Sequence, residues 1–210
     1  MKIKVCGMRD VENIRKAGEL AIDYMGFIFY PPSPRFAGDS LLPPEALENL
    51  PPTIRKTGVF VSENINTLFN YVEKYALDVV QLHGKEAPEY CHTIKEKYPL
   101  INIIKGFPIS VPADFDCTTG YETVCDFFLF DTKTPLYGGS GQQFDWKISE
   151  SYQGKTPFFL SGGLSANDAE KIKELQHPAL YGIDLNSRFE IRAGIKNIDL
   201  LQTFIKTVKT

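Results

Sequence analysis

Short apolar segments rich in β-branched and aromatic residues alternate with helical patterns along all 210 residues of the sequence. The expected strands are Ile3–Cys6, Tyr24–Tyr30, Lys56–Val61, Val79–Leu82, Ile101–Phe107, Phe127–Asp131, Pro157–Ser161 and Leu180–Leu185. The expected helices are Val11–Gly18, Pro43–Leu50, Ile65–Tyr75, Ala87–Tyr98, Thr119–Val124, Asp145–Tyr152, Ala166–Leu175 and Ile198–Thr207. Eight consecutive strand-then-helix units predict an α/β fold, a closed (β/α)8 TIM barrel that forms a single domain over residues 1–210.

A doubly wound open sheet is the alternative architecture, because it needs the same alternation of strands and helices. Such sheets usually have fewer strands, so the closed barrel is favoured. Two residues that commonly begin helices agree with the expected boundaries. Asn64 precedes Ile65 and Ser165 precedes Ala166, and each side chain is expected to accept a hydrogen bond from an amide of the first turn.

Charge and composition indicate a small ligand and a cytoplasmic protein. The net charge is −3 and the basic residues are scattered, which argues against a nucleic-acid partner. No apolar stretch reaches the roughly 18 to 20 residues of a membrane helix, and Met1 to Asp10 lacks the apolar core of a signal peptide. Four cysteines without CxxC spacing are expected to be free thiols, and a structural metal site is not expected. The sequence leaves a monomer and a homodimer equally open.

Polar and glycine-rich segments follow the expected strands, at the end of the barrel where active sites of this architecture lie. These segments are Cys6-Gly7 with Arg9, Tyr30 to Phe36, Gln81 to Gly84, Asp131 with Gly138 to Gly141, Ser161 to Leu164 and Asp184 to Arg188. Because the carboxyl ends of parallel strands meet around one opening, their side chains are expected to face a common ligand.

Cys6 and Asp131 form a candidate base and acid on two different strands. A thiol and a carboxyl that face one substrate from opposite sides can divide the work of a proton-transfer reaction. As a base, Cys6 requires a lowered pKa, and Arg35 is a candidate source of the positive charge. As an acid, Asp131 must hold a proton at neutral pH, which requires desolvation or a like-charged neighbour. The alternative role of Asp131 is a carboxylate that pairs with Lys133 or caps the following loop. The alternative role of Cys6 is an inert buried thiol.

Ser161-Gly162-Gly163 leads into an expected helix, where amides exposed by glycine form a seat for a phosphate group. Asn186 and Ser187, at the end of the adjacent strand, are expected to complete it. Phosphate binding by the loops after the last two strands is common in this architecture, which favours a phosphorylated sugar as substrate. A tight turn without a ligand is the alternative role for this segment.

Three further side chains have candidate roles at the same end of the barrel. Arg35 lies in a proline-rich loop and is expected to hold a carboxylate or to stack on a planar ring, unless it is an ordinary exposed arginine. Asp184 is expected either to orient a sugar hydroxyl or to accept from amides at the mouth. His83 is expected to be a turn residue bonded to backbone, because no partner carboxylate is evident in the sequence.

Taken as a set, these motifs resemble those of phosphoribosylanthranilate isomerases of tryptophan biosynthesis. The matching segments are Lys4-Val5-Cys6-Gly7, Gly26 to Tyr30 with Ser33-Pro34-Arg35, Gly58 to Val61, Val80 to Gly84, Asp131-Thr132-Lys133 with Gly138 to Gly141 and Phe144-Asp145-Trp146, and Ser161 to Leu164. The resemblance covers almost the whole chain in order. One segment departs from it, since many members have Gly where this chain has Arg188.

The resemblance implies a (β/α)8 barrel that converts N-(5'-phosphoribosyl)anthranilate into 1-(2-carboxyphenylamino)-1-deoxyribulose 5-phosphate without a cofactor. It implies that Asp131 is the general acid and Cys6 the general base. It further implies that Arg35 holds the anthranilate carboxylate, while Gly162, Gly163, Asn186 and Ser187 hold the phosphate.

Three other functions compete with this interpretation. A related barrel of histidine biosynthesis performs the same rearrangement on a different amine, but it typically uses two aspartates where this chain pairs Cys6 with Asp131. A catalytically silent barrel that binds a phosphorylated metabolite and regulates a partner needs no acid and base. A thiol redox protein is disfavoured by the missing CxxC motif.

Overall fold

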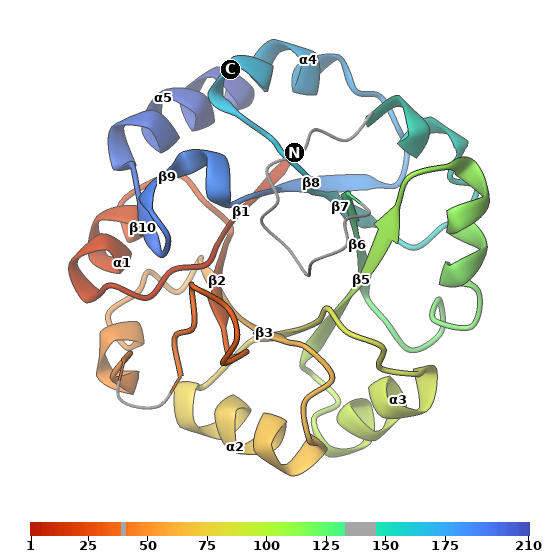
Figure 1. Ribbon diagram of the computed structural model, residues 1–210, viewed down its shortest axis with the longest axis horizontal. Coiled ribbons are helices and arrows are strands. Elements are labelled where there is room, and N and C mark those ends of the chain that lie inside the picture. Colours follow the sequence, from red (N-terminus) through yellow and green to blue (C-terminus); the bar gives the residue numbers. More distant parts are fainter. Residues whose placement is uncertain (39–40, 133–145) are drawn as a thin grey trace.

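The computed structural model describes residues 1–38, 41–132 and 146–210, and it contains all eight expected strands. The strands are β1 (Lys2–Cys6), β2 (Tyr24–Ile28), β3 (Arg55–Phe60), β4 (Val79–Leu82), β5 (Asn102–Ile109), β6 (Phe127–Thr132), β7 (Phe158–Leu160) and β8 (Leu180–Leu185). They close into a parallel barrel in chain order, and β8 pairs with β1 (Figure 1). The TIM-barrel prediction is therefore confirmed, and the open sheet is excluded.

Helices surround the barrel, as Figure 1 shows, but several connections are short 3-10 helices. The α-helices are α1 (Val11–Gly18), α2 (Ile65–Tyr75), α3 (Pro88–Lys97), α4 (Ala169–Glu174) and α5 (Ile198–Lys209). The 3-10 helices are η1 (Pro44–Leu47), η2 (Pro112–Thr118), η3 (Trp146–Ser151), η4 (Ala166–Asp168) and η5 (Ser187–Phe189). The segments expected to be α-helices at 43–50 and 145–152 thus contain η1 and η3, while Asp145 lies outside the described residues.

The prediction of a helix at Thr119–Val124 is wrong, because the helical segment between β5 and β6 is η2, which ends at Thr118. Asp114 starts η2 early by accepting hydrogen bonds from the backbone amides of Ser110 and Val111. Gly120 has a φ of 88°, a left-handed conformation that no helix continues through. Residues 121–124 form turns instead.

One of the two expected helix caps is confirmed. Asn64 Oδ1 accepts a hydrogen bond from the amide of Asn66 at 2.9 Å at the start of α2. Ser165 does not act as the expected acceptor, because its amide and hydroxyl both donate to the carboxylate of Asp168. The side chain of Asp168 therefore organises the start of η4 from within the turn.

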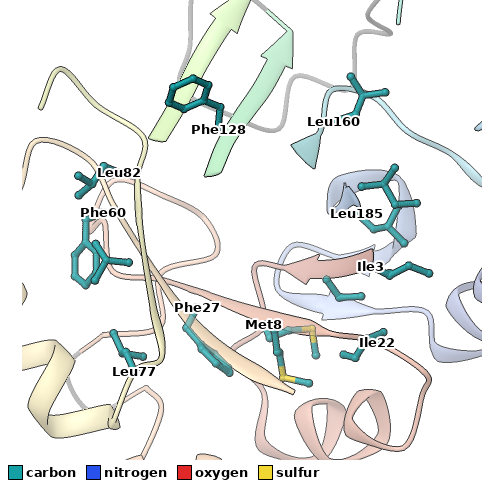
Figure 2. Close-up of a cluster of buried hydrophobic side chains, with 14 of the residues drawn as sticks. Ile3, Met8, Ile22, Phe27, Phe60, Leu77, Leu82, Phe128, Leu160 and Leu185 are labelled. Atoms are coloured by element: carbon teal, nitrogen blue, oxygen red, sulfur yellow. The ribbon is translucent and has the colours of Figure 1, made fainter. Parts of the chain in front are cut away.

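The alternation of side chains along each strand produces two buried layers. One fills the barrel interior and contains Tyr24, Val79, Ile104, Leu129 and Phe159. The other lies between the strands and the surrounding helices, and Figure 2 shows part of it, including Phe27, Phe60, Leu82, Phe128 and Leu185. Because the interior layer fills the lower barrel with apolar groups, polar side chains that point inward gather near the carboxyl ends of the strands.

A short hairpin that was not expected follows β8. Its strands, β9 (Glu190–Arg192) and β10 (Ile195–Lys196), are antiparallel and lie between the expected strand Leu180–Leu185 and the expected helix Ile198–Thr207. Lys196 is anchored to α1, because its backbone amide and carbonyl both bond the Asn13 side chain. The hairpin thus fixes Glu190 and Lys196 beside the barrel. Within the described residues, no helix is long and apolar enough to cross a lipid bilayer.

Candidate active site

Cys6 and Lys4 occupy alternate positions of β1 and share the inner side of the barrel. Cys6 is 3% exposed and Lys4 is fully buried. The ammonium of Lys4 interacts electrostatically with the Cys6 side chain and donates to Asp184 Oδ1 of β8 at 2.9 Å. Lys4 and Asp184 are paired in the β1–β8 register, so the parallel sheet itself sets this contact. A buried ion pair therefore lies directly beneath the thiol.

The chain makes room for the thiol by placing Gly26 opposite it. Cys6 and Gly26 are partners in the β1–β2 register, and a Cβ at Gly26 would lie 2.8 Å from Cys6 Sγ. Burial is the largest influence on the thiol and raises the pKa of Cys6, and the charge of Asp184 raises it further. Lys4 and Lys196 oppose this effect without reversing it.

The lowered pKa that a thiolate base requires is therefore not present at Cys6 in the free protein. The main positive charges that act on the thiol come from Lys4 and Lys196, not from the candidate Arg35. The reason is burial: the strand holds the thiol inside the barrel wall, where removal from water outweighs the two ammonium groups.

Asp131 lies at the end of β6, on the inner side of the barrel, and is partly exposed. His83 Nε2 lies 3.5 Å from Asp131 Oδ2, and the two side chains are 17% and 18% exposed. The expectation that His83 is a turn residue without a carboxylate partner is therefore wrong. The contact could not be predicted from the sequence, because His83 follows β4 and Asp131 lies on β6, and β5 separates these two strands. The alternative partner Lys133 and the segment Gly138 to Gly141 lie outside the described residues.

Arg35 is not an ordinary exposed arginine, because its side chain is 11% exposed and is clamped by Glu190 of β9. Its Nε and Nη2 atoms donate to both carboxylate oxygens of Glu190 at 2.7 to 3.1 Å. Lys196 Nζ donates to the same carboxylate at 2.7 Å. Burial alone would raise the pKa of Glu190, but the hydrogen bond from Arg35 and the charge of Lys196 outweigh it and lower that pKa.

The expected phosphate-binding residues occupy the loops after β7 and β8. Gly162 and Gly163 have φ values of 95° and 69°, a conformation that suits glycine. Asn186 Oδ1 accepts from Lys196 Nζ at 2.8 Å, and Ser187 begins η5. Asn186 and Lys196 thereby link this end of the barrel to the clamp on Arg35, whereas Arg188 is exposed.

Gly7 allows the segments after β1 and β8 to approach each other. Its φ is 79°, and a Cβ there would lie 2.7 Å from Arg35 Cδ and 2.8 Å from Asn186 Oδ1. The expected site residues Cys6, Arg35 and Asn186 therefore meet around one glycine.

Four polar residues of this site were not identified from the sequence: Lys4, Gln81, Glu190 and Lys196. The sequence contained a clue to two of them, because Lys4 and Gln81 are polar residues that lie between apolar residues in expected strands. It contained no clue to Glu190 and Lys196, because their place at the site depends on the hairpin. In residues 1–38, 41–132 and 146–210, no cluster of three or more His, Cys, Asp or Glu side chains is arranged to hold a metal ion.

The chain matches one known family over nearly its whole length. Residues 3–207 match the family model of N-(5'phosphoribosyl)anthranilate (PRA) isomerase. The N-(5'-phosphoribosyl)anthranilate isomerase of Parabacteroides distasonis is 47% identical over 99% of this chain and 93% of its own length.

Solved structures show the same relationship. The phosphoribosyl anthranilate isomerase of Thermus thermophilus superposes with a TM-score of 0.84 at 27% identity, covering 100% of this chain and 98% of its own. Another, solved in complex with reduced 1-(o-carboxyphenylamino)-1-deoxyribulose 5-phosphate, superposes with a TM-score of 0.79 at 28% identity and the same coverage. With a barrel that carries a thiol, a carboxyl and a clamped arginine at one end, this chain belongs to the N-(5'-phosphoribosyl)anthranilate isomerase family.

Proposed function

We propose that Asp131 and Cys6 divide the proton transfers of the isomerase reaction between them. The chain is an isomerase of tryptophan biosynthesis, which converts N-(5'-phosphoribosyl)anthranilate into 1-(2-carboxyphenylamino)-1-deoxyribulose 5-phosphate. The observation that carries the assignment is that β1 and β6, two separate strands of the barrel, present a buried thiol and a partly exposed carboxyl on its inner side.

In the first step, the carboxyl of Asp131 donates its proton to the furanose ring oxygen. The bond between that oxygen and C1' breaks, and the electron pair of the anthranilate nitrogen forms a protonated Schiff base. The positive charge next to C2' makes the C2' proton more acidic. Asp131 is left as a carboxylate within reach of His83.

In the second step, the thiolate of Cys6 removes the C2' proton. The electrons of that C–H bond form the C1'–C2' double bond, and the π electrons of the C1'–N double bond move onto the nitrogen, which gives a neutral enolamine. Tautomerisation to the ketone completes the rearrangement. Lys4 supports this step, because its ammonium contacts the Cys6 side chain and favours the thiolate.

For substrate binding, we propose that Arg35 receives the anthranilate carboxylate. The clamp by Glu190 engages Nε and Nη2 and leaves Nη1 outside that pair. Gly162, Gly163, Asn186 and Ser187 are proposed to hold the phosphate, supported by the left-handed turn at both glycines. Asp184 is proposed to act near the sugar as well as on Lys4. A cytoplasmic location and a monomeric or homodimeric state stay predictions of the sequence.

The decisive experiment follows the loss of the fluorescence of the N-linked anthranilate group when freshly generated substrate is added to the protein. Cys6→Ser and Asp131→Asn should each slow turnover by at least about 100-fold, the range of a lost general acid or base. The matched controls are Cys117→Ser and Asp116→Asn, because both residues are exposed and lie in η2. If wild type leaves the spontaneous decay unchanged, the silent metabolite-binding barrel becomes the better explanation.

A further inference from the structure

A glycine on β5 allows His83 to reach Asp131 from two strands away. β4 and β6 both pair with β5, and the side chain of His83 extends from the end of β4 toward β6. A Cβ at Gly106 would lie 2.6 Å from His83 Nδ1, so the imidazole ring occupies the space that any other residue would fill. The contact between His83 and Asp131 therefore depends on the missing side chain at position 106.

The other edge of the imidazole is held by Gln81. Gln81 precedes His83 by two residues on the same inner side of the barrel, and its Nε2 lies 3.2 Å from His83 Nδ1. Gln81 is 2% exposed, and among the described residues its Oε1 atom has no hydrogen-bond partner. A buried amide oxygen without a partner costs free energy, so the orientation of this amide needs a compensating reason.

We propose that Gln81 and His83 are positioning residues for Asp131. The amide of Gln81 donates to Nδ1, which places the imidazole proton on Nε2. Nε2–H then points at Asp131 Oδ2 and holds the carboxyl in the orientation from which it gives its proton to the substrate. The unpaired Oε1 of Gln81 follows from this arrangement, because Nε2 of the amide is the atom turned toward the ring.

The arrangement acts on the transition state more than on the bound substrate. At 3.5 Å the His83–Asp131 contact is longer than a hydrogen bond in the free site. As the proton leaves, Asp131 gains negative charge, and a donor already aimed at Oδ2 stabilises that charge without reorganisation. No proton moves onto or off His83 in this scheme, so the balance of the first step is unchanged.

The inference rests on the role of Asp131 proposed above, and the test separates the two. His83→Met removes the donor, whereas His83→Gln retains an amide N–H that reaches the position of Nε2. We expect His83→Met to lower kcat at least tenfold while KM changes less than twofold, and His83→Gln to recover most of that loss. His92→Gln is the matched control, because His92 is an exposed histidine of α3.

A double-mutant cycle asks whether His83 acts through Asp131. In the Asp131→Asn background, His83→Met should cause no further loss, because the group that it positions is gone. Nitrogen chemical shifts of His83 should show the Nε2–H tautomer in wild type and a mixture in Gln81→Met, with the fold checked by thermal unfolding.

Equal losses in His83→Met and His83→Gln, losses that multiply in the double mutant, or an Nδ1–H tautomer in wild type would each overturn the positioning role. Full activity of Asp131→Asn would instead overturn the proposed acid, and with it the premise of this inference.

Discussion

Lys4 and Asp184 form an ion pair inside the barrel, with Nζ 2.9 Å from Oδ1 and both side chains at most 6% exposed. The pair lies beside the Cys6 thiol, and its lysine lowers the pKa of that thiol more than Lys196 does. Burial lowers the pKa of Lys4, but Asp184 and Cys6 together outweigh that effect and raise it, so the lysine stays charged. The candidate base Cys6 thus has beside it a charged lysine, Lys4, that is shielded from water.

Removing this cation should impair both the base and the fold. Lys4→Met leaves Asp184 buried without its partner, which costs about 3 to 5 kcal/mol for a broken buried pair. It also raises the pKa of Cys6 further, so kcat at neutral pH should fall. Urea unfolding and a spectroscopic thiol titration measure the two effects.

Lys2→Met is the control for Lys4→Met, because Lys2 forms an ion pair with Asp23 while half exposed. Such surface pairs contribute under about 1 kcal/mol. A Lys4→Met protein with unchanged activity would show that Lys4 has no influence on the base.

The thiolate form of Cys6 should increase with pH across the neutral range. Burial raises the pKa of Cys6 above its ordinary value, so the thiol form predominates at pH 7 and the thiolate is the minor species. Below that pKa, the rate at which a small alkylating reagent modifies Cys6 should increase about tenfold per pH unit as the thiolate fraction grows. Alkylation rates between about pH 6 and 9, with Cys6→Ser measured in parallel to subtract the other thiols, test this, and a rate that stops rising below about pH 8 would contradict the raised pKa.

The Glu190 carboxylate should make part of the stability depend on pH. Its folded-state pKa is lower than the ordinary 4.5, so the unfolded chain binds this proton more tightly than the native protein does. The contribution is therefore fully present above about pH 5 and is lost as pH falls through the lowered folded pKa. Urea unfolding between about pH 6 and 3 should show a shallower pH dependence in Glu190→Gln.

The control for this measurement is Glu170→Gln, because the Glu170 side chain is 75% exposed on α4. Its pH dependence should match that of wild type. An equal change in both variants would mean that the clamp on Arg35 does not account for the effect.

Gly7→Ala should damage substrate binding as well as stability. A Cβ at position 7 would collide with Arg35 and Asn186, and the φ of 79° adds backbone strain of about 1 to 2 kcal/mol. Displacing Arg35 should raise KM.

Gly120→Ala separates the collision from the strain. Gly120 has a φ of 88°, but the nearest atom to its Cβ position is 3.9 Å away. It should lose a similar strain energy in thermal unfolding and keep its KM. If both variants keep their KM, the close approach at Gly7 does not position Arg35.

The sequence by itself determined the barrel and the two strand ends that carry the candidate base and acid. Strand and helix periodicities are local properties, and eight alternating units leave few ways to bury both sides of every strand. The position of Cys6 and Asp131 at the carboxyl ends of two expected strands predicted that both face a common opening, because the carboxyl ends of parallel strands meet there. Connections such as η2 were predicted poorly, since local turn chemistry at Asp114 and Gly120 decided them.

Only the tertiary structure decided which side chains contact one another at the site. The partner of His83 comes from a strand 48 residues later, and that contact exists because Gly106 on the strand between them leaves the space. Arg35 contacts Glu190, which is 155 residues later in the chain. Glu190 lies in a hairpin that no local sequence pattern predicted. The pKa of Cys6 likewise depends on how completely the barrel excludes water from the thiol. Burial and long-range pairing arise from closure of the whole sheet, and so they are absent from any short stretch of sequence.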